Sequence, residues 1–119
     1  MVVGMKFSGK HLMLAIETDF DLENVLAVKT ILCEAVKATG ATILGTLEHK
    51  FTPQGYSAVV LIAESHASIH TYPECKPLQR AFIDYFTCGN IVPHKFAKYI
   101  FNNLKINKLN ILSNKTIKR

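Results

Sequence analysis

The sequence predicts a two-layer α/β sandwich of the α+β class, in which a mostly antiparallel sheet is backed by two helices. Strand-like segments outnumber helical ones, and links of hairpin length join the strands in the middle of the chain. The 119 residues suit one domain with its own core. We therefore expect a single domain over residues 1–119 and not a doubly wound parallel sheet.

The chain begins with a predicted strand and helix. Residues 10–17 form an apolar strand, after which Asp19 and Asp21 are candidate N-caps, and Gly40 is placed to end the helix. The apolar residues between them recur at helical spacing and should face the sheet. They are Val25, Val28, Leu32, Ala35 and Val36.

Several strands are expected next, with a turn at residues 53–55 and a proline stop at Pro73. They cover residues 41–50, 57–63, 67–72 and 81–87.

A second helix should follow, capped by Asn90, with Pro93 in its first turn. Residues 107–112 then close the sheet, and residues 113–119 are expected to form a frayed tail.

Charge is spread unevenly along the chain. The formal net charge is +5, and Asp84 is the last acidic residue. Residues 85–119 carry seven bases, which could mark a nucleic-acid partner, but no aromatic residue follows Phe101 to stack on bases. We therefore interpret the basic third as a solubilising surface and do not expect nucleic-acid binding.

The cysteines and the apolar runs indicate a cytoplasmic protein. Cys33, Cys75 and Cys88 are odd in number and form no Cys-x-x-Cys motif, so neither a disulfide framework nor a zinc ribbon fits. No apolar run approaches the ~18 to 20 residues of a membrane span. The N-terminus lacks the pattern of a signal peptide.

Residues 64–74 concentrate chemically active side chains: hydroxyls, imidazoles, a phenol and carboxylates. His66 and His70, with Cys88 downstream, suggest a metal site at first. The β-branched residues and Pro73 favour a strand, on which two histidines four residues apart lie ~13 Å from each other. That separation argues against one shared ion, so we expect no metal. A serine hydrolase lacks its Gly-x-Ser-x-Gly elbow here, and a half-buried strand with a polar face stays open.

These runs resemble the prokaryotic S-adenosylmethionine decarboxylases, small pyruvoyl-dependent enzymes that make the aminopropyl donor for spermidine. The family pattern reads roughly G-[RK]-H, then H-[KR]-F-x-P-x-G, then E-S-H-x-[ST]-I-H-T-W-P-E, then F-T-C-G. The chain is similar in the same order over about residues 9–104, at residues 9–11, 48–55, 64–74 and 86–89.

The resemblance implies self-cleavage between Glu64 and Ser65, into a β chain (1–64) and an α chain (65–119). The Ser65 hydroxyl would attack the Glu64 carbonyl, and elimination and hydrolysis would leave a pyruvoyl group at the start of the α chain. His70 and Ser57 match family residues that assist this processing. A base and a hydroxyl beside the peptide suit such an acyl shift.

The resemblance also implies the catalytic parts. The pyruvoyl cofactor, with no metal, would form a Schiff base with the amine of S-adenosylmethionine and take up electrons as CO₂ leaves. Cys88 matches the family proton donor, Phe51 an aromatic that stacks on adenine, and Glu74 a carboxylate that holds the ribose. Tyr72 stands where the family has Trp and offers a π face. The expected assembly is a homodimer of αβ units with shared sites.

Two departures from the family pattern, Tyr72 in place of Trp and a longer stretch over residues 75–85, leave alternatives for the substrate open. The stretch 75–85 is about three residues longer than in the family, and it carries Lys76 and Arg80 near the expected site. Relatives with this fold decarboxylate arginine or ornithine, and these substrates remain alternatives. A non-catalytic binding module with a basic surface is the further alternative.

Overall fold

The computed structural model describes residues 9–63 and 65–119, and within them every expected element appears in the expected order. The elements are β1 (Gly9–Thr18), α1 (Val25–Lys37), β2 (Ile43–Lys50), β3 (Tyr56–Ile62), β4 (Ser65–Tyr72), β5 (Gln79–Cys88), α2 (His94–Asn103) and β6 (Leu109–Lys118).

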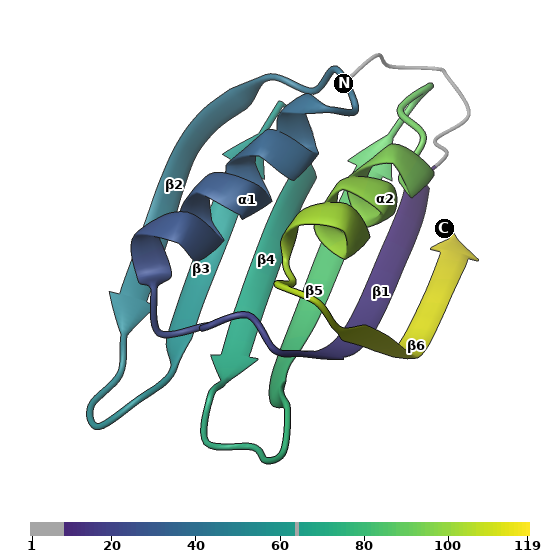
Figure 1. The fold of residues 1–119 in the computed structure, drawn as a ribbon. Helices are drawn as coiled ribbons and strands as arrows, with labels where there is room; N and C mark the ends of the chain where they lie inside the picture. Colours follow the sequence, from purple (N-terminus) through teal and green to yellow (C-terminus); the bar gives the residue numbers. More distant parts are fainter. Residues whose placement is uncertain (1–8, 64) are drawn as a thin grey trace.

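The strands form one sheet in the order β2-β3-β4-β5-β1-β6. Each neighbouring pair in it is antiparallel. Figure 1 shows α1 and α2 lying side by side across the same face of this sheet, so that no helix of residues 9–63 and 65–119 lies over the opposite face. The predicted α+β sandwich is confirmed.

The core lies between the sheet and the two helices. Because side chains alternate across a strand, every second residue of β3, β4 and β5 points into this layer and is buried. Full burial of a large apolar side chain contributes ~1.5–3 kcal/mol. The largest such side chains include Ile16, Leu22, Leu32, Tyr56, Ile62, Ile69, Ile83, Tyr85, Phe96, Ile100 and Leu104.

Helix α1 begins a few residues later than expected. The Asn24 side chain is the N-cap and accepts a hydrogen bond from the Ala27 N–H at 3.3 Å. Asp21 is not the cap, because its carboxylate accepts the Glu23 N–H in the preceding turn, at 3.1 Å. Gly40, with φ 84°, lies beyond the end of the helix, as expected of a residue in the left-handed region.

Helix α2 follows Pro93, which is its N-cap, and Asn90 is not the cap that the sequence suggested. Its apolar face packs on the sheet through Phe96, Ala97 and Ile100. Across residues 9–63 and 65–119, no helix is both long enough and apolar enough to cross a bilayer.

The prediction of a frayed tail over residues 113–119 was wrong. Strand β6 continues to Lys118 and pairs with β1, from Leu109 opposite Thr18 to Lys118 opposite Lys10. Backbone hydrogen bonds between Gly9 and Arg119 extend this pairing. The polar composition of the segment reflects an outer strand exposed to solvent, where the ladder with β1 supplies the order.

A single carboxylate joins the end of β1 to the turn before β6. The Asp19 oxygens accept the backbone N–H groups of Ile106, at 2.8 Å, and Asn107, at 2.9 Å. Desolvation works to raise the pKa of Asp19, but the backbone N–H donors outweigh it and hold the pKa below its ordinary value.

We expect Asp19→Ala to lower the thermal midpoint at pH 7, because the two N–H groups lose their acceptor. A carboxyl whose pKa is depressed by folding stabilises fully above its unfolded value, 3.8, and loses that contribution as the pH falls through its folded value. The gap between variant and wild type should therefore close below about pH 4. A gap that stays constant from pH 7 to pH 3 would contradict this role.

Candidate functional site

Strand β4 divides the chemically active segment between the two faces of the sheet. Ser65, Ala67 and Ile69 are buried toward the helices, whereas His66 and His70 are exposed on the open face. The alternation follows from the period-two geometry of a strand. The histidines therefore share a face but lie ~13 Å apart along one strand.

Ser65 is the first residue of β4 and has a buried hydroxyl. Its relative exposure is 9%, and within the described residues its Oγ has no hydrogen-bond partner. A buried hydroxyl without a partner costs free energy, so its retention calls for a chemical explanation. The predicted cleavage partner, Glu64, lies outside the described residues.

Ser57 and His70 form a hydrogen-bonded pair on the open face. They lie directly opposite each other on β3 and β4, and Ser57 Oγ shares a hydrogen bond of 2.7 Å with His70 Nδ1. A hydroxyl bonded to an imidazole can exchange a proton with it, which suits acid–base work. On the other side of Ser57, His49 of β2 lies in the same cross-strand row.

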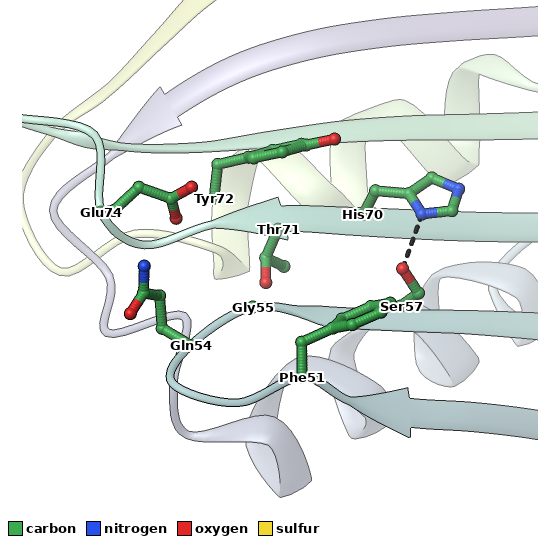
Figure 2. Close-up of a pocket in the computed structure, with 8 residues that line it drawn as sticks. All are labelled: Phe51, Gln54, Gly55, Ser57, His70, Thr71, Tyr72 and Glu74. Carbon is green, nitrogen blue, oxygen red and sulfur yellow. Dashed lines mark hydrogen bonds between the residues drawn. The ribbon is translucent and has the colours of Figure 1, made fainter.

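A cavity of about 480 Å³ opens beside this pair, between the β2–β3 turn and the end of β4. Its size falls in the range of small-molecule sites. Phe51 and Tyr72 remain 47% and 43% exposed, so that parts of both rings are open to a ligand. The lining residues, shown in Figure 2, are Phe51, Gln54, Gly55, Ser57, His70, Thr71, Tyr72 and Glu74.

Sequence reasoning expected five of these lining residues but missed Gln54, Gly55 and Thr71. The signal for Gln54 was present, since it lies in the predicted turn between Phe51 and Ser57. Thr71 is buried and donates to the Tyr56 carbonyl oxygen at 3.4 Å, which is a supporting role.

Three side chains beneath the turn hold β2 against β3 and α1. Glu48 of β2 accepts from Lys29 of α1 and from the hydroxyl of Tyr56. Lys29 and then Tyr56 lower the pKa of Glu48. Burial and the contact with Glu48 raise the pKa of Tyr56, which therefore stays protonated. These contacts fix β2, which Phe51 directly follows, and β3, which carries Ser57.

Cys88 lies at the opposite end of the sheet from the cavity. It is the last residue of β5 and pairs with Gly9, two positions beyond the pairing of Phe86 with His66. Cys88 comes two residues after Phe86 on β5, and residues two apart on a strand point to the same side. Cys88 therefore faces the open side of the sheet, as Phe86 does. The register therefore places Cys88 beside the end of β4 that begins with Ser65.

The predicted site residues thus fall into two groups within one protomer. Ser65 and Cys88 lie at one end of the sheet, on opposite faces of it, and the pair Ser57–His70 with the cavity lies at the other end. Ser65 and His70 are five residues apart on an extended strand, or ~17 Å. The structure does not bring them together within one chain.

The longer loop after β4 does not contribute its cations to the cavity. Neither Lys76 nor Arg80 is among the lining residues, and Arg80 faces Glu17 at 3.9 Å. The loop is held by Gln79, whose side-chain oxygen accepts the Leu22 N–H at 2.9 Å.

Within residues 9–63 and 65–119, no cluster of three or more His, Cys, Asp and Glu side chains has the spacing to hold a metal ion. The polar groups of the site include the hydroxyl–imidazole pair Ser57–His70, the Cys88 thiol, the Glu74 carboxylate and the Gln54 amide, together with the hydroxyls of Ser65, Thr71 and Tyr72. These groups serve proton transfer and hydrogen bonding.

Fold and site together define a small α+β sandwich protein with a ligand-sized cavity toward one end of an open antiparallel sheet and a buried serine at the other. Residues 13–116 match the family model described as S-adenosylmethionine decarboxylase. The chain is 40% identical over 111 residues to the S-adenosylmethionine decarboxylase proenzyme of Methanococcus maripaludis strain C5, covering 91% of this chain and 88% of that one.

Two further comparisons point to the same family. The chain is 39% identical over 114 residues to the S-adenosylmethionine decarboxylase proenzyme of Thermosipho melanesiensis, covering 91% and 83% of the two chains. The crystal structure of the adenosylmethionine decarboxylase from Aquifex aeolicus is similar with a TM-score of 0.72 at 28% identity, over 97% of this chain and 91% of that one. The chain belongs to the S-adenosylmethionine decarboxylase family, and the predicted resemblance is confirmed.

The turn that presents Gln54 depends on a glycine. Gly55 has φ 107°, which side chains rarely adopt, although an added Cβ would meet only ordinary contacts, at 3.6 Å to the Thr71 oxygen and 3.7 Å to Phe51 Cβ. We expect Gly55→Ala to destabilise the fold by ~1–2 kcal/mol through backbone strain, as measured by urea denaturation. Gly45→Ala is the matched control, because its Cβ would meet nothing within 4 Å and its φ is unexceptional. Equal stability of the two variants would contradict the dependence of this turn on a glycine at position 55.

Proposed function

We propose that this chain is an S-adenosylmethionine decarboxylase proenzyme that generates its own pyruvoyl group from Ser65. The observation that carries the proposal is the buried Ser65 hydroxyl, which has no partner within the described residues and stands at the first position of β4. Family membership supplies the chemical class, and the cavity supplies a site for the substrate.

The chemistry of Ser65 fits a pyruvoyl precursor. Its Oγ attacks the carbonyl carbon of the preceding residue, Glu64, and the peptide bond becomes an ester. Elimination then releases the carboxyl end of the 1–64 chain and leaves dehydroalanine at position 65, which takes up water and loses ammonia. A hydroxyl that makes no hydrogen bond to the described part of the chain is available for this attack, and low solvation strengthens the electrostatics around it.

The remaining residues act around that group. When present, the pyruvoyl carbonyl binds the substrate amine and withdraws electrons as CO₂ departs. Cys88, at the same end of the sheet, is proposed to return a proton to the carbon that loses CO₂. Ser57 and His70 are proposed to move protons during processing, which their 2.7 Å hydrogen bond supports.

The cavity favours a nucleoside-bearing substrate. Phe51 and Tyr72 offer aromatic surfaces on which a purine can stack, and Glu74 offers two acceptor oxygens to ribose hydroxyls. The long loop adds no cation to the cavity lining, so the insertion does not change the charge of the groups that line the cavity. S-adenosylmethionine therefore fits the lining better than arginine or ornithine.

A second copy of the chain is proposed to complete each site. The open face of the sheet exposes Leu47, Val59, Leu61 and Phe82, each at 40% or more, and such an apolar surface is typical of an interface. Face-to-face packing of two such sheets through a twofold axis can bring the Ser65 end of one chain to the cavity of the other. We propose a homodimer of αβ units on this ground.

The cytoplasm is the proposed location. Cys33 and Cys75 are partly buried thiols that form no disulfide, which is the usual state of cysteines in a reducing compartment.

Processing can be tested by denaturing mass spectrometry of the purified protein. We expect two chains, of 64 and 55 residues, the second without a free amino terminus, and we expect Ser65→Ala to give one uncut, inactive chain. The variant removes only the attacking oxygen, so its fold should survive. If Ser65→Ala still released CO₂ from S-adenosylmethionine, the pyruvoyl mechanism would be excluded.

Complementation can test the shared site. Cys88→Ala and Glu74→Ala should each abolish most activity while leaving self-cleavage intact, since neither residue is proposed to act in processing. Co-expressed, half of the dimers are mixed, and each mixed dimer has one intact site, so activity should return to about a quarter of wild type. Activity that stays at the level of the single variants would place the whole site within one protomer.

A further inference from the structure

The cavity contains an amide, that of Gln54, to which no side chain among residues 9–63 and 65–119 is hydrogen-bonded. Among the eight residues drawn in Figure 2, the hydrogen bond runs between Ser57 and His70, and Gln54 has none. Gln54 is half-buried, and its amide lies at the same end of the cavity as Glu74. A partly desolvated amide without a partner is suited to a ligand that offers both a donor and an acceptor.

The aromatic side chains cannot choose among purines. Phe51 and Tyr72 present π surfaces, and stacking of this kind accepts any base, because every base has a π face. Selection among bases requires hydrogen bonds to the edge of the ring. Any discrimination in this cavity must therefore come from its polar groups.

Of those polar groups, the Gln54 amide matches the edge of adenine best, because the hydroxyls of Thr71 and Tyr72 each have one oxygen and cannot place a donor and an acceptor side by side. Ser57 and His70 are bonded to each other, at the end of the cavity away from Gln54. Ionised Glu74 has acceptors only, so it would repel the N1 lone pair of adenine, whereas two ribose hydroxyls suit it. An amide carries one acceptor and one donor side by side, which complements the 6-amino group and N1 of adenine.

We propose that Gln54 selects adenine over other purines. Its Oε1 accepts a hydrogen bond from the 6-amino group, and its Nε2–H donates to N1. This inference rests on the proposed function, since it takes a nucleoside-bearing substrate in this cavity as given. The substrate's sulfur-bearing chain would then extend along the cavity toward Ser57 and His70, at the opposite end.

The test is equilibrium binding by calorimetry on the purified, full-length protein. The probes are 5′-methylthioadenosine and the same thionucleoside without its 6-amino group. Wild type should bind the adenine nucleoside about threefold to tenfold more tightly, the worth of one neutral hydrogen bond. In Gln54→Met, which keeps the length of the side chain but not its polar atoms, that ratio should fall to about one. Glu74→Gln, the matched control, should weaken both probes alike and keep the ratio.

A third probe tests the inference on wild type without any variant. The N6,N6-dimethyl nucleoside has no N–H to donate, so it should bind no better than the nucleoside without the amino group. Equal binding of all probes by wild type, or an unchanged ratio in Gln54→Met, would overturn the role of Gln54 and leave the proposed function standing. If wild type bound none of the nucleosides, the proposed function would fail and the inference with it.

Discussion

Along β4, successive side chains point to opposite sides of the sheet, and this alternation sends Ser65 into the core and His70 to the open face. The same strand, fully extended, separates the two residues by ~17 Å. The separation is fixed by backbone geometry and cannot be closed by a change of rotamer. The division of the proposed site into an end with Ser65 and Cys88 and an end with the cavity therefore follows from the geometry of a single β-strand.

The placement of the helix layer on one side of the sheet is related to the same alternation of side chains along the strands. Helices α1 and α2 cover the face toward which Ser65 points, and no helix in the described part of the chain covers the face with Ser57, His70 and the cavity (Figure 1). Apolar residues on that face, such as Leu61 and Phe82, are exposed in the single chain. An exposed apolar face of this kind is typical of an interface, which supports the proposed homodimer.

Local sequence patterns predicted the helices and strands well, but they predicted less well which distant residues each element contacts. Period-two alternation and helical spacing placed every strand and helix, because both signals are contained within a few neighbouring residues. The frayed tail was wrong because β6 is ordered by its ladder with β1, a contact across about one hundred residues that its polar composition conceals. The cap at Asp19 was wrong for a similar reason, since that carboxylate bonds to Ile106 and Asn107 instead. Gln54 lies in a turn that the sequence predicted, but it was missed because the sequence does not show which side chains of the turn face the cavity.

Substrate choice can be argued from the charges that the cavity presents. Arginine and ornithine end in a cation, and a site for either needs acidic groups around that end of the ligand. The lining holds one carboxylate, Glu74, together with two aromatic rings and an amide. Tyr72 in place of the family tryptophan reduces the stacking area but keeps a flat π surface. The insertion before β5 leaves Arg80 facing Glu17 on the next strand, outside the cavity lining, so it does not reverse this balance. A flat, uncharged ring system can stack on the two aromatic rings and bond to the amide, and a diol joined to it can bond to Glu74. The side chain of a basic amino acid has no ring to stack and no diol.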